Sequence, residues 1–198
     1  MTGIVLAGGM SRRMGTDKAF LKISGVPMIE HVLRSLRSVV DHVIIVTNAP
    51  EAFASYGAKV VIDALAVPGP LTGIYSGLLE SADECNFVVA CDMPFLNPGL
   101  VSYLSGLAEG YDIVAPKING LVEPLHAVYC RKLLPFIRKR IETDARKIQD
   151  LFSEARVRYV TEQEVDRFDP EHRSFMNLNT VEEYKEAACS DLDFRNSS

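Results

Sequence analysis

The stretch GIVLAGGMSRRMGTDK, residues 3–18, decides how the rest of the chain is interpreted. It begins with a short apolar run, which is typical of a parallel strand that is covered on both faces. Gly8 and Gly9 follow at once, and glycines let a backbone turn sharply and bring its N–H groups close to a ligand. The stretch therefore predicts a strand that ends in an anion-binding loop.

The loop is also rich in positive charge. Arg12, Arg13 and Lys18 lie close together in an otherwise acidic chain, and Gly15 adds further freedom to the backbone. Arginine and lysine side chains of this kind suit a triphosphate. Neither GxxxxGK[ST] nor GxGxxG is present, so this is not one of the common nucleotide fingerprints. The alternative is an ordinary strand-to-helix turn with solvated arginines; the combined spacing favours a phosphate site.

Beyond the loop, short β-branched runs alternate with longer amphipathic segments. This pattern predicts a single-domain α/β fold, a Rossmann-like, open, mostly parallel sheet with helices on both faces. The domain is expected to span residues 1–189, and residues 190–198 are expected to form a disordered tail. An extra strand crossing the sheet is expected at 126–130, after a less regular segment at 117–123. The main strands are expected at residues 3–7, 42–47, 59–63, 86–92, 112–116 and 157–161.

Several helix starts are marked by residues that favour them. Pro27 is expected in the first turn of one helix, and Thr72 is expected to cap another. Asn97 before Pro98 has the sequence of a cap followed by a first-turn proline. Thr180 and Glu183 have capping-box spacing near the end of the chain.

Ligands of open α/β folds bind beyond the carboxyl ends of the strands, so the acids at those ends are site candidates. Asp92 ends a buried run and precedes Pro94, and a carboxylate there suits Mg2+. Asp63 ends another strand and can accept hydrogen bonds from a ribose, a base or the loop arginines. For both residues the alternative is an aspartate that only caps a turn.

Two further motifs are candidates for substrate contact. In PGPLTG, residues 68–73, Gly69 and Gly73 allow close approach of a flat group such as a base, although a rigid connection into a helix explains them equally well. Asn177 and Asn179 share a face if their segment is extended, and two amides there suit a phosphate or an acceptor. Local turn and cap bonding is the alternative for these asparagines. His126 is expected to be structural.

Composition limits the class of protein. The chain has 198 residues and a formal net charge of -5, which argues against a surface built to bind nucleic acid. No export signal or membrane-spanning run is recognisable, so a cytoplasmic protein without membrane contact is expected. The cysteines form no CxxC pair, which indicates neither zinc nor a redox motif, and they are expected to be reduced, with Cys91 buried.

Taken in order, LAGGMSRRMGTDK, PGPLTG, CDMPFL and FMNLNT resemble the molybdenum cofactor guanylyltransferases, the MobA-like nucleotidyltransferase family. The resemblance runs from about residue 3 to residue 183. It implies that Leu6, Ala7 and Gly8 contact a nucleotide. By the same resemblance, Lys18 binds the phosphates, Asp63 the nucleoside and Asp92 the Mg2+. The resemblance places Asn177 and Asn179 on the acceptor side. Asn48 is a weaker match for nucleotide binding.

The family resemblance implies GTP as donor and molybdopterin, in its molybdenum-bearing form, as acceptor. Lys18 and Arg13 would stabilise phosphate charge while Mg2+ on Asp92 aids transfer of GMP. A cytidylyltransferase, a sugar-phosphate nucleotidyltransferase of the same fold and a non-catalytic nucleotide-binding regulator are the alternatives. Whether a partner protein delivers the acceptor is left open by the sequence.

Overall fold

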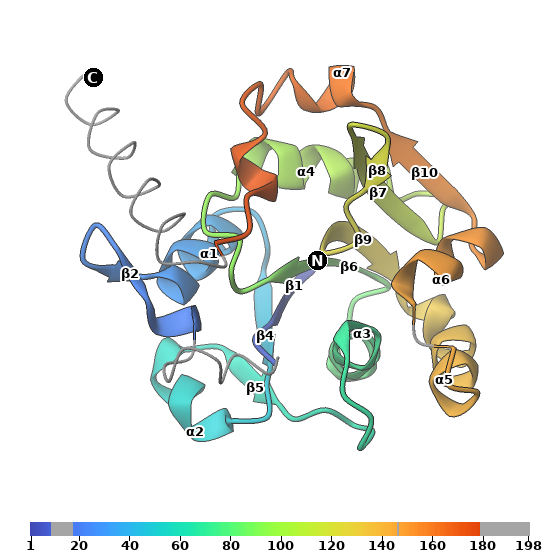
Figure 1. Cartoon of the computed structure of the whole chain (residues 1–198), viewed down its shortest axis with the longest axis horizontal. Coiled ribbons are helices and arrows are strands. Elements are labelled where there is room, and N and C mark those ends of the chain that lie inside the picture. Colours follow the sequence, from blue (N-terminus) through green and yellow to red (C-terminus); the bar gives the residue numbers. More distant parts are fainter. Residues whose placement is uncertain (9–17, 146, 179–198) are drawn as a thin grey trace.

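A central sheet, flanked by helices on both faces, organises the protein (Figure 1). The computed structural model describes residues 1–8, 18–145 and 147–178. Its main sheet has the order β10-β7-β9-β6-β1-β4-β5, with β8 paired to β7. The strands are β1 (Thr2–Leu6), β4 (His42–Val46), β5 (Lys59–Val61), β6 (Cys85–Ala90), β7 (Ile113–Ile118), β8 (Leu121–Val122), β9 (His126–Cys130) and β10 (Val157–Val160); a separate hairpin pairs β2 (Lys22–Ile23) with β3 (Val26–Pro27).

Helices cover the two faces of this sheet, and each face has its own apolar core. One core packs α1, α2, α4 and α7 against the sheet, and the other packs α3, α5 and α6 against the opposite face. No described helix has the length and apolar character needed to cross a bilayer. The helices are α1 (Met28–Arg37), α2 (Pro50–Phe53), α3 (Pro70–Glu80), α4 (Pro98–Gly106), α5 (Leu134–Glu142), α6 (Ile148–Glu154) and α7 (Glu162–Val165), with 3-10 turns η2 (Lys18–Phe20), η3 (Ala54–Tyr56), η4 (Arg131–Leu133) and η5 (Arg173–Phe175).

The predicted α/β architecture is confirmed, and every expected strand is present with small shifts at its ends. The extra strand is β9, which is antiparallel to both β6 and β7, whereas the β1–β4, β1–β6, β4–β5 and β7–β10 pairs are parallel. The segment expected to be less regular contains the tight β7–β8 hairpin. Its turn is made by Asn119 and Gly120, which both have positive φ angles and suit this turn.

Of the four predicted helix starts, two are wrong in detail, one is right, and the one at Thr180 and Glu183 lies outside the described residues. Pro27 ends β3 and occupies the N-cap position immediately before α1, instead of lying in the first turn of the helix. Thr72 lies inside α3, which begins earlier because Gly69, with φ of 147°, turns the chain into Pro70. Asn97 caps α4 as expected: its side chain accepts the backbone N–H of Leu100.

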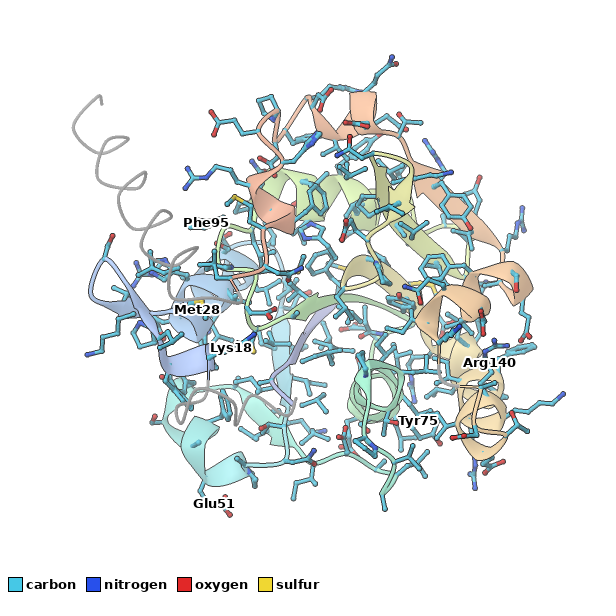
Figure 2. The ribbon with its side chains drawn as sticks, in the orientation of Figure 1. Lys18, Met28, Glu51, Tyr75, Phe95 and Arg140 are labelled. Carbon is cyan, nitrogen blue, oxygen red and sulfur yellow. A yellow bond between two sulfur atoms is a disulfide. The ribbon has the colours of Figure 1, made fainter. Side chains whose placement is uncertain are left out.

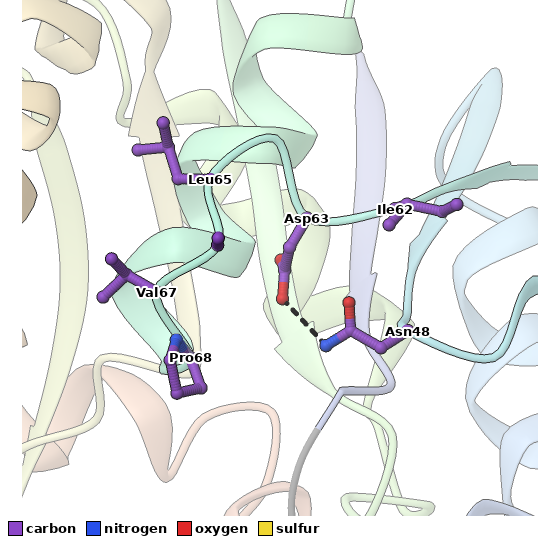
Figure 3. A pocket seen from close by; sticks show the side chains of 7 residues that line it. Asn48, Ile62, Asp63, Leu65, Val67 and Pro68 are labelled. Carbon is purple, nitrogen blue, oxygen red and sulfur yellow. Dashed lines mark hydrogen bonds between the residues drawn. The ribbon is translucent and has the colours of Figure 1, made fainter.

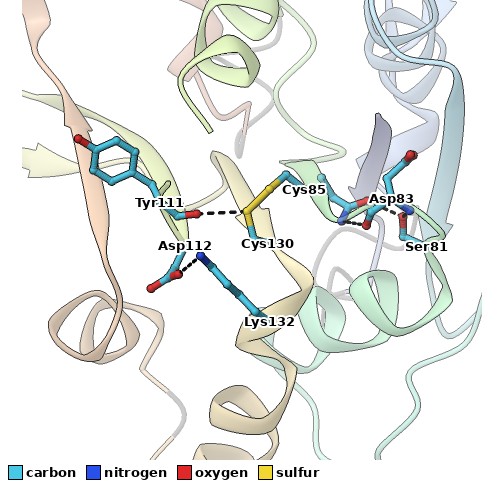
Figure 4. Close-up of a disulfide and its surroundings, with 8 residues drawn as sticks. Ser81, Asp83, Cys85, Tyr111, Asp112, Cys130 and Lys132 are labelled. Atoms are coloured by element: carbon cyan, nitrogen blue, oxygen red, sulfur yellow. Dashed lines mark hydrogen bonds and ion pairs between the residues drawn. A yellow bond between two sulfur atoms is a disulfide. The ribbon is translucent and has the colours of Figure 1, made fainter. Parts of the chain in front are cut away.

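The cysteines do not match the expectation of reduced thiols. Cys85 and Cys130 form a disulfide across the antiparallel pair β6–β9 (Figure 4). They lie directly opposite each other in the register, with their Cα atoms 4.1 Å apart, so the pairing follows from strand alignment and not from a sequence motif. Cys91 is half-buried, not fully buried, and Cys189 lies outside the described residues.

A polar network fixes the turn between β10 and α7. Thr161 and Glu164 form a capping box, and the Glu164 carboxylate also accepts from the Tyr103 hydroxyl and from Arg158. Burial alone would raise the pKa of Glu164, but hydrogen bonds from Thr161, Tyr103 and Arg158 outweigh it and lower the pKa to about 2. The ionised carboxylate therefore stabilises the folded chain.

We expect Glu164→Gln to lower the free energy of unfolding at pH 7 by about 1–2 kcal/mol. Because the pKa of Glu164 is lower in the folded state than its ordinary value of 4.5, the stabilisation is present above that pH and is lost as the pH falls toward 2. Urea unfolding of the variant and the wild type between pH 3 and pH 7 measures it. A stability difference that stays constant over this range would contradict the assignment.

Candidate nucleotide-binding site

Strand register brings the candidate residues to one edge of the sheet. Leu6 at the end of β1 lies between Val46 of β4 and Ala90 of β6, and all these strands are parallel. The residues that follow each strand therefore leave the sheet at the same edge. Backbone bonds continue the alignment past the strands, because Cys91 N–H donates to Leu6 O at 3.1 Å. Gly8 and Asp92 thus belong to one cleft region, as the sequence predicts.

A pocket of about 290 Å³ opens beyond β4 and β5 (Figure 3). Asn48 and Asp63 form its polar part: Asn48 Nδ2 donates to Asp63 Oδ2 at 3.1 Å. Gly8 adjoins it, since a Cβ at Gly8 would lie 3.9 Å from Asn48 Nδ2. Its volume is at the small end of the range for ligand pockets. The lining residues are Asn48, Ile62, Asp63, Leu65, Ala66, Val67 and Pro68.

Asp63 presents an unsatisfied acceptor. Its Oδ1 atom is buried and has no hydrogen-bond partner among the described residues. Burial raises the pKa of Asp63, and the Asn48 amide and the Ser76 hydroxyl only partly oppose this. The turn that carries the carboxylate is fixed, because the next backbone N–H, of Ala64, donates to the Ser76 hydroxyl of α3 at 2.9 Å. A ligand with N–H or O–H groups would supply the missing donor.

Gly73 has a packing contact within the protein. A Cβ at this position would lie 3.1 Å from Leu6 Cδ2, so glycine allows α3 to approach β1 closely. Gly73 is buried in α3. The chain turns instead at the exposed Gly69, which has a positive φ. The predicted contact between Gly73 and a base stays a prediction, and the local geometry accounts for the glycine without it.

Asp92 and Lys18 come together from distant parts of the chain. Asp92 follows β6 and is half-buried, and Lys18 begins the η2 turn. Burial raises the pKa of Asp92, while the positive charge of Lys18 lowers it. The ammonium group is therefore close enough to act on the carboxylate. This is the convergence of a cation and a strand-terminal acid that the sequence predicts.

The donor set suits a metal that binds together with its substrate. No group of three or more His, Cys, Asp or Glu side chains that could hold a metal occurs in the described part of the chain. Mg2+ commonly takes one or two carboxylates and completes its shell with water and substrate phosphates. Asp92 fits that role, because its desolvated carboxylate would be stabilised by a cation.

A small apolar cluster joins the segments that carry these groups. Ile23, Met28 and Leu178 are buried together, with Leu21 and Phe95 packed against them. The cluster is separate from the two main cores. In Figure 2 its members Met28 and Phe95 lie on the same side of the molecule as Lys18.

Backbone hydrogen bonds also join the segments that this cluster brings together. Leu178 N–H donates to Asp92 O at 3.1 Å, and Leu21 N–H donates to Lys18 O at 3.1 Å. The segment after Lys18, the segment after β6 and the segment ending at Leu178 are therefore held together by one set of contacts. Asn177, which is exposed, is placed next to Asp92 by this arrangement.

Some predicted site residues lie outside the described residues: Gly9, Arg12, Arg13 and Asn179. Their predicted roles stay predictions. Asn48 is only a weak match to the family in sequence, although it lines the pocket and donates a hydrogen bond to Asp63. Its position directly after β4, at the same edge as Gly8, was the available signal. The apolar cluster was missed, because its members are distant in sequence. His126 is buried between Phe87 and Phe175, as a structural residue would be.

A parallel sheet that brings Gly8, Lys18 and the strand-terminal Asp92 to one edge is the arrangement expected of a nucleotidyltransferase. Residues 3–160 match the model of the MobA-like NTP transferase domain, and the chain belongs to that family. The resemblance found in the sequence is thereby confirmed.

Relatives with assigned names agree with the family. A molybdenum cofactor guanylyltransferase of Desulfosudis oleivorans is 36% identical, covering 96% of this chain and 95% of that protein. A probable molybdenum cofactor guanylyltransferase of Methanosarcina mazei is 40% identical, covering 92% of this chain and 87% of that protein. The crystal structure of molybdopterin-guanine dinucleotide biosynthesis protein A from Archaeoglobus fulgidus has a TM-score of 0.85 and 30% identity, covering 96% of this chain and 100% of that one.

The apolar cluster yields a test of how the site is held. We expect Leu178→Ala to lower nucleotidyl transfer about tenfold, because small displacements of positioned groups are costly, and to lower stability by about 2–4 kcal/mol. Leu151→Ala is the matched control: Leu151 is equally buried, but in α6 on the opposite face. Turnover per folded molecule, measured beside urea unfolding, separates the two. Equal turnover in both variants would show that the cluster has no positioning role.

Proposed function

We propose that this protein transfers GMP from GTP to the phosphate of molybdopterin, giving the guanine dinucleotide form of the cofactor and pyrophosphate. The observation that carries the proposal is the convergence of the Asp63 pocket, Gly8, Lys18 and Asp92 at one edge of the sheet. The named relatives support the choice of donor and acceptor.

In this proposal the pocket at Asn48 and Asp63 holds the nucleoside. The buried Oδ1 of Asp63 accepts a hydrogen bond from the ribose or from the guanine edge, and Ile62, 58% exposed, offers an apolar contact to the ring. The phosphates then extend past Gly8 toward Lys18. The backbone N–H groups after β1 and the lysine ammonium bind the negative charge.

Asp92 is the residue that would hold Mg2+, which supplies charge neutralisation to the phosphates when bound. Lys18, beside Asp92, adds a second positive charge that does not depend on the metal. Arg13, in the loop before Lys18, is proposed to assist it.

The acceptor is proposed to bind on the β6 side of the cleft, next to Asn177 and Asn179. An acceptor phosphate oxygen attacks the α-phosphorus of GTP, and pyrophosphate leaves. A phosphate dianion already carries its nucleophilic electron pair, so the chain needs no general base. Its residues contribute alignment and electrostatic stabilisation, which are the main sources of catalysis in such transfers. A cytoplasmic setting for this reaction is part of the proposal.

The test measures pyrophosphate release by the purified chain with molybdopterin, Mg2+ and each of GTP, CTP, ATP and UTP, alongside thermal shift with each nucleotide. We expect GTP to give release and the largest stabilisation, because binding to the folded state raises the melting temperature. A preference for CTP would make the protein a cytidylyltransferase. Nucleotide binding without release would favour a regulator.

Asp92→Ala tests the metal assignment within the same assay. We expect release to fall by about a hundredfold or more, because the variant loses the group that positions charge at the phosphates. The fold should survive, since only Asp92 O, a backbone atom, bonds to Leu178. Glu171→Ala, at an exposed position, is the control and should transfer normally. Turnover of Asp92→Ala at the wild-type level would remove Asp92 from the mechanism.

A further inference from the structure

Glu123 lies on the acceptor side of the cleft edge. Because β9 is antiparallel to both β6 and β7, β7 runs in the same direction as β6, and its carboxyl end lies at the site edge. The chain turns there, returns as β8, and Glu123 N–H donates to Pro116 O of β7 at 3.0 Å. In the sheet β9 separates β7 from β6, and strands lie about 4.8 Å apart, so the end of β7 is about 10 Å across the sheet from the end of β6.

The turn that carries Glu123 is rigid. Its carbonyl oxygen accepts from His126 N–H at 3.3 Å, and the next carbonyl, of Pro124, accepts from the Tyr129 hydroxyl at 2.8 Å. His126 packs on Phe175, with ring centroids 4.8 Å apart. The segment that leads to Asn177 is therefore beside this turn.

The Glu123 side chain is half-buried, yet nothing in the described chain satisfies it. Its carboxylate has neither a hydrogen bond nor an ion pair with any described residue. Burial raises the pKa of Glu123, and no charge of a described residue opposes this. His126 adds no charge, since burial lowers its pKa to about 3 and leaves it neutral. A partly desolvated carboxylate without a partner costs folding free energy, and such groups concentrate at functional sites.

The chemistry of a carboxylate limits what it can bind. It repels the acceptor phosphate, so it suits the other end of that molecule. A pterin ends in a 2-amino-4-oxopyrimidine edge, whose ring N–H and amino group point the same way and match the two oxygens of one carboxylate. The apolar neighbours Val122 and Leu125, both half-buried, provide surface for a flat ring.

We propose that Glu123 recognises the pterin of the acceptor by accepting hydrogen bonds from its pyrimidine edge. This inference rests on the proposed function. It places the pterin beside the end of β7, across β6 from the pocket at β4 and β5. Glu123 is then a specificity-determining residue for the acceptor and has no part in nucleotide binding.

Glu123→Gln tests the proposal, because glutamine keeps the shape but presents an amino group to one of the pterin donors. We expect kcat/KM for molybdopterin to fall about tenfold to a hundredfold, the usual effect of an unpaired polar group in a recognition site. KM for GTP and the thermal shift with GTP should not change. The melting temperature should be equal or higher, since the variant removes an unpaired carboxylate; a purely structural role would lower it.

Glu109→Gln is the matched control, because Glu109 is exposed and precedes β7 at the opposite edge of the sheet. It should behave as the wild type. Unchanged acceptor kinetics in Glu123→Gln would overturn the inference, and so would an equal loss for GTP and acceptor.

A second measurement separates this inference from the proposed function. Titration of the wild type and Glu123→Gln with 6-hydroxymethylpterin, followed by pterin fluorescence, reports the pterin contact without any transfer. Weaker binding by the variant supports the contact even if GTP is not the donor. Equal pterin binding by both proteins refutes it even if GMP transfer by the wild type is normal.

Discussion

The parallel register of β1 between β4 and β6 is the constraint on which the site depends. Leu6 aligns with Val46 on one side and with Ala90 on the other. Main-chain hydrogen bonds fix this alignment, and a slip of one residue would turn every buried side chain to the opposite face. Gly8, the pocket at Asn48 and Asp63, and Asp92 therefore keep a common edge for as long as the core is intact.

The loops beyond that edge need their own support, because strand pairing ends where the chemistry begins. The cluster of Ile23, Met28 and Leu178 supplies it with apolar packing, and the Leu178–Asp92 backbone bond adds direction. Positioning of reacting groups is a large part of catalysis in phosphoryl transfer.

The described acidic side chains with shifted pKa values fall into two groups, those with a lowered and those with a raised pKa. Glu164 is surrounded by donors, its pKa is lowered to about 2, and it stabilises the chain. Asp63 and Glu123 are partly buried, and burial raises the pKa of each. Among the described residues, neither Asp63 Oδ1 nor the Glu123 carboxylate has a hydrogen-bond partner. The first pattern is that of a structural network, whereas the second leaves bonding capacity for a ligand at a cost in stability.

The sequence by itself determined the α/β class, the strands, the Asn97 cap, and the candidate groups Gly8, Lys18, Asp63 and Asp92, because apolar periodicity and strand-terminal polar residues are local signals. Only the tertiary structure decided the contacts between distant segments. These are the Cys85–Cys130 disulfide, the packing of Gly73 on Leu6 and the cluster around Leu178. Each depends on register and on how closely two elements approach, which no single stretch of chain encodes.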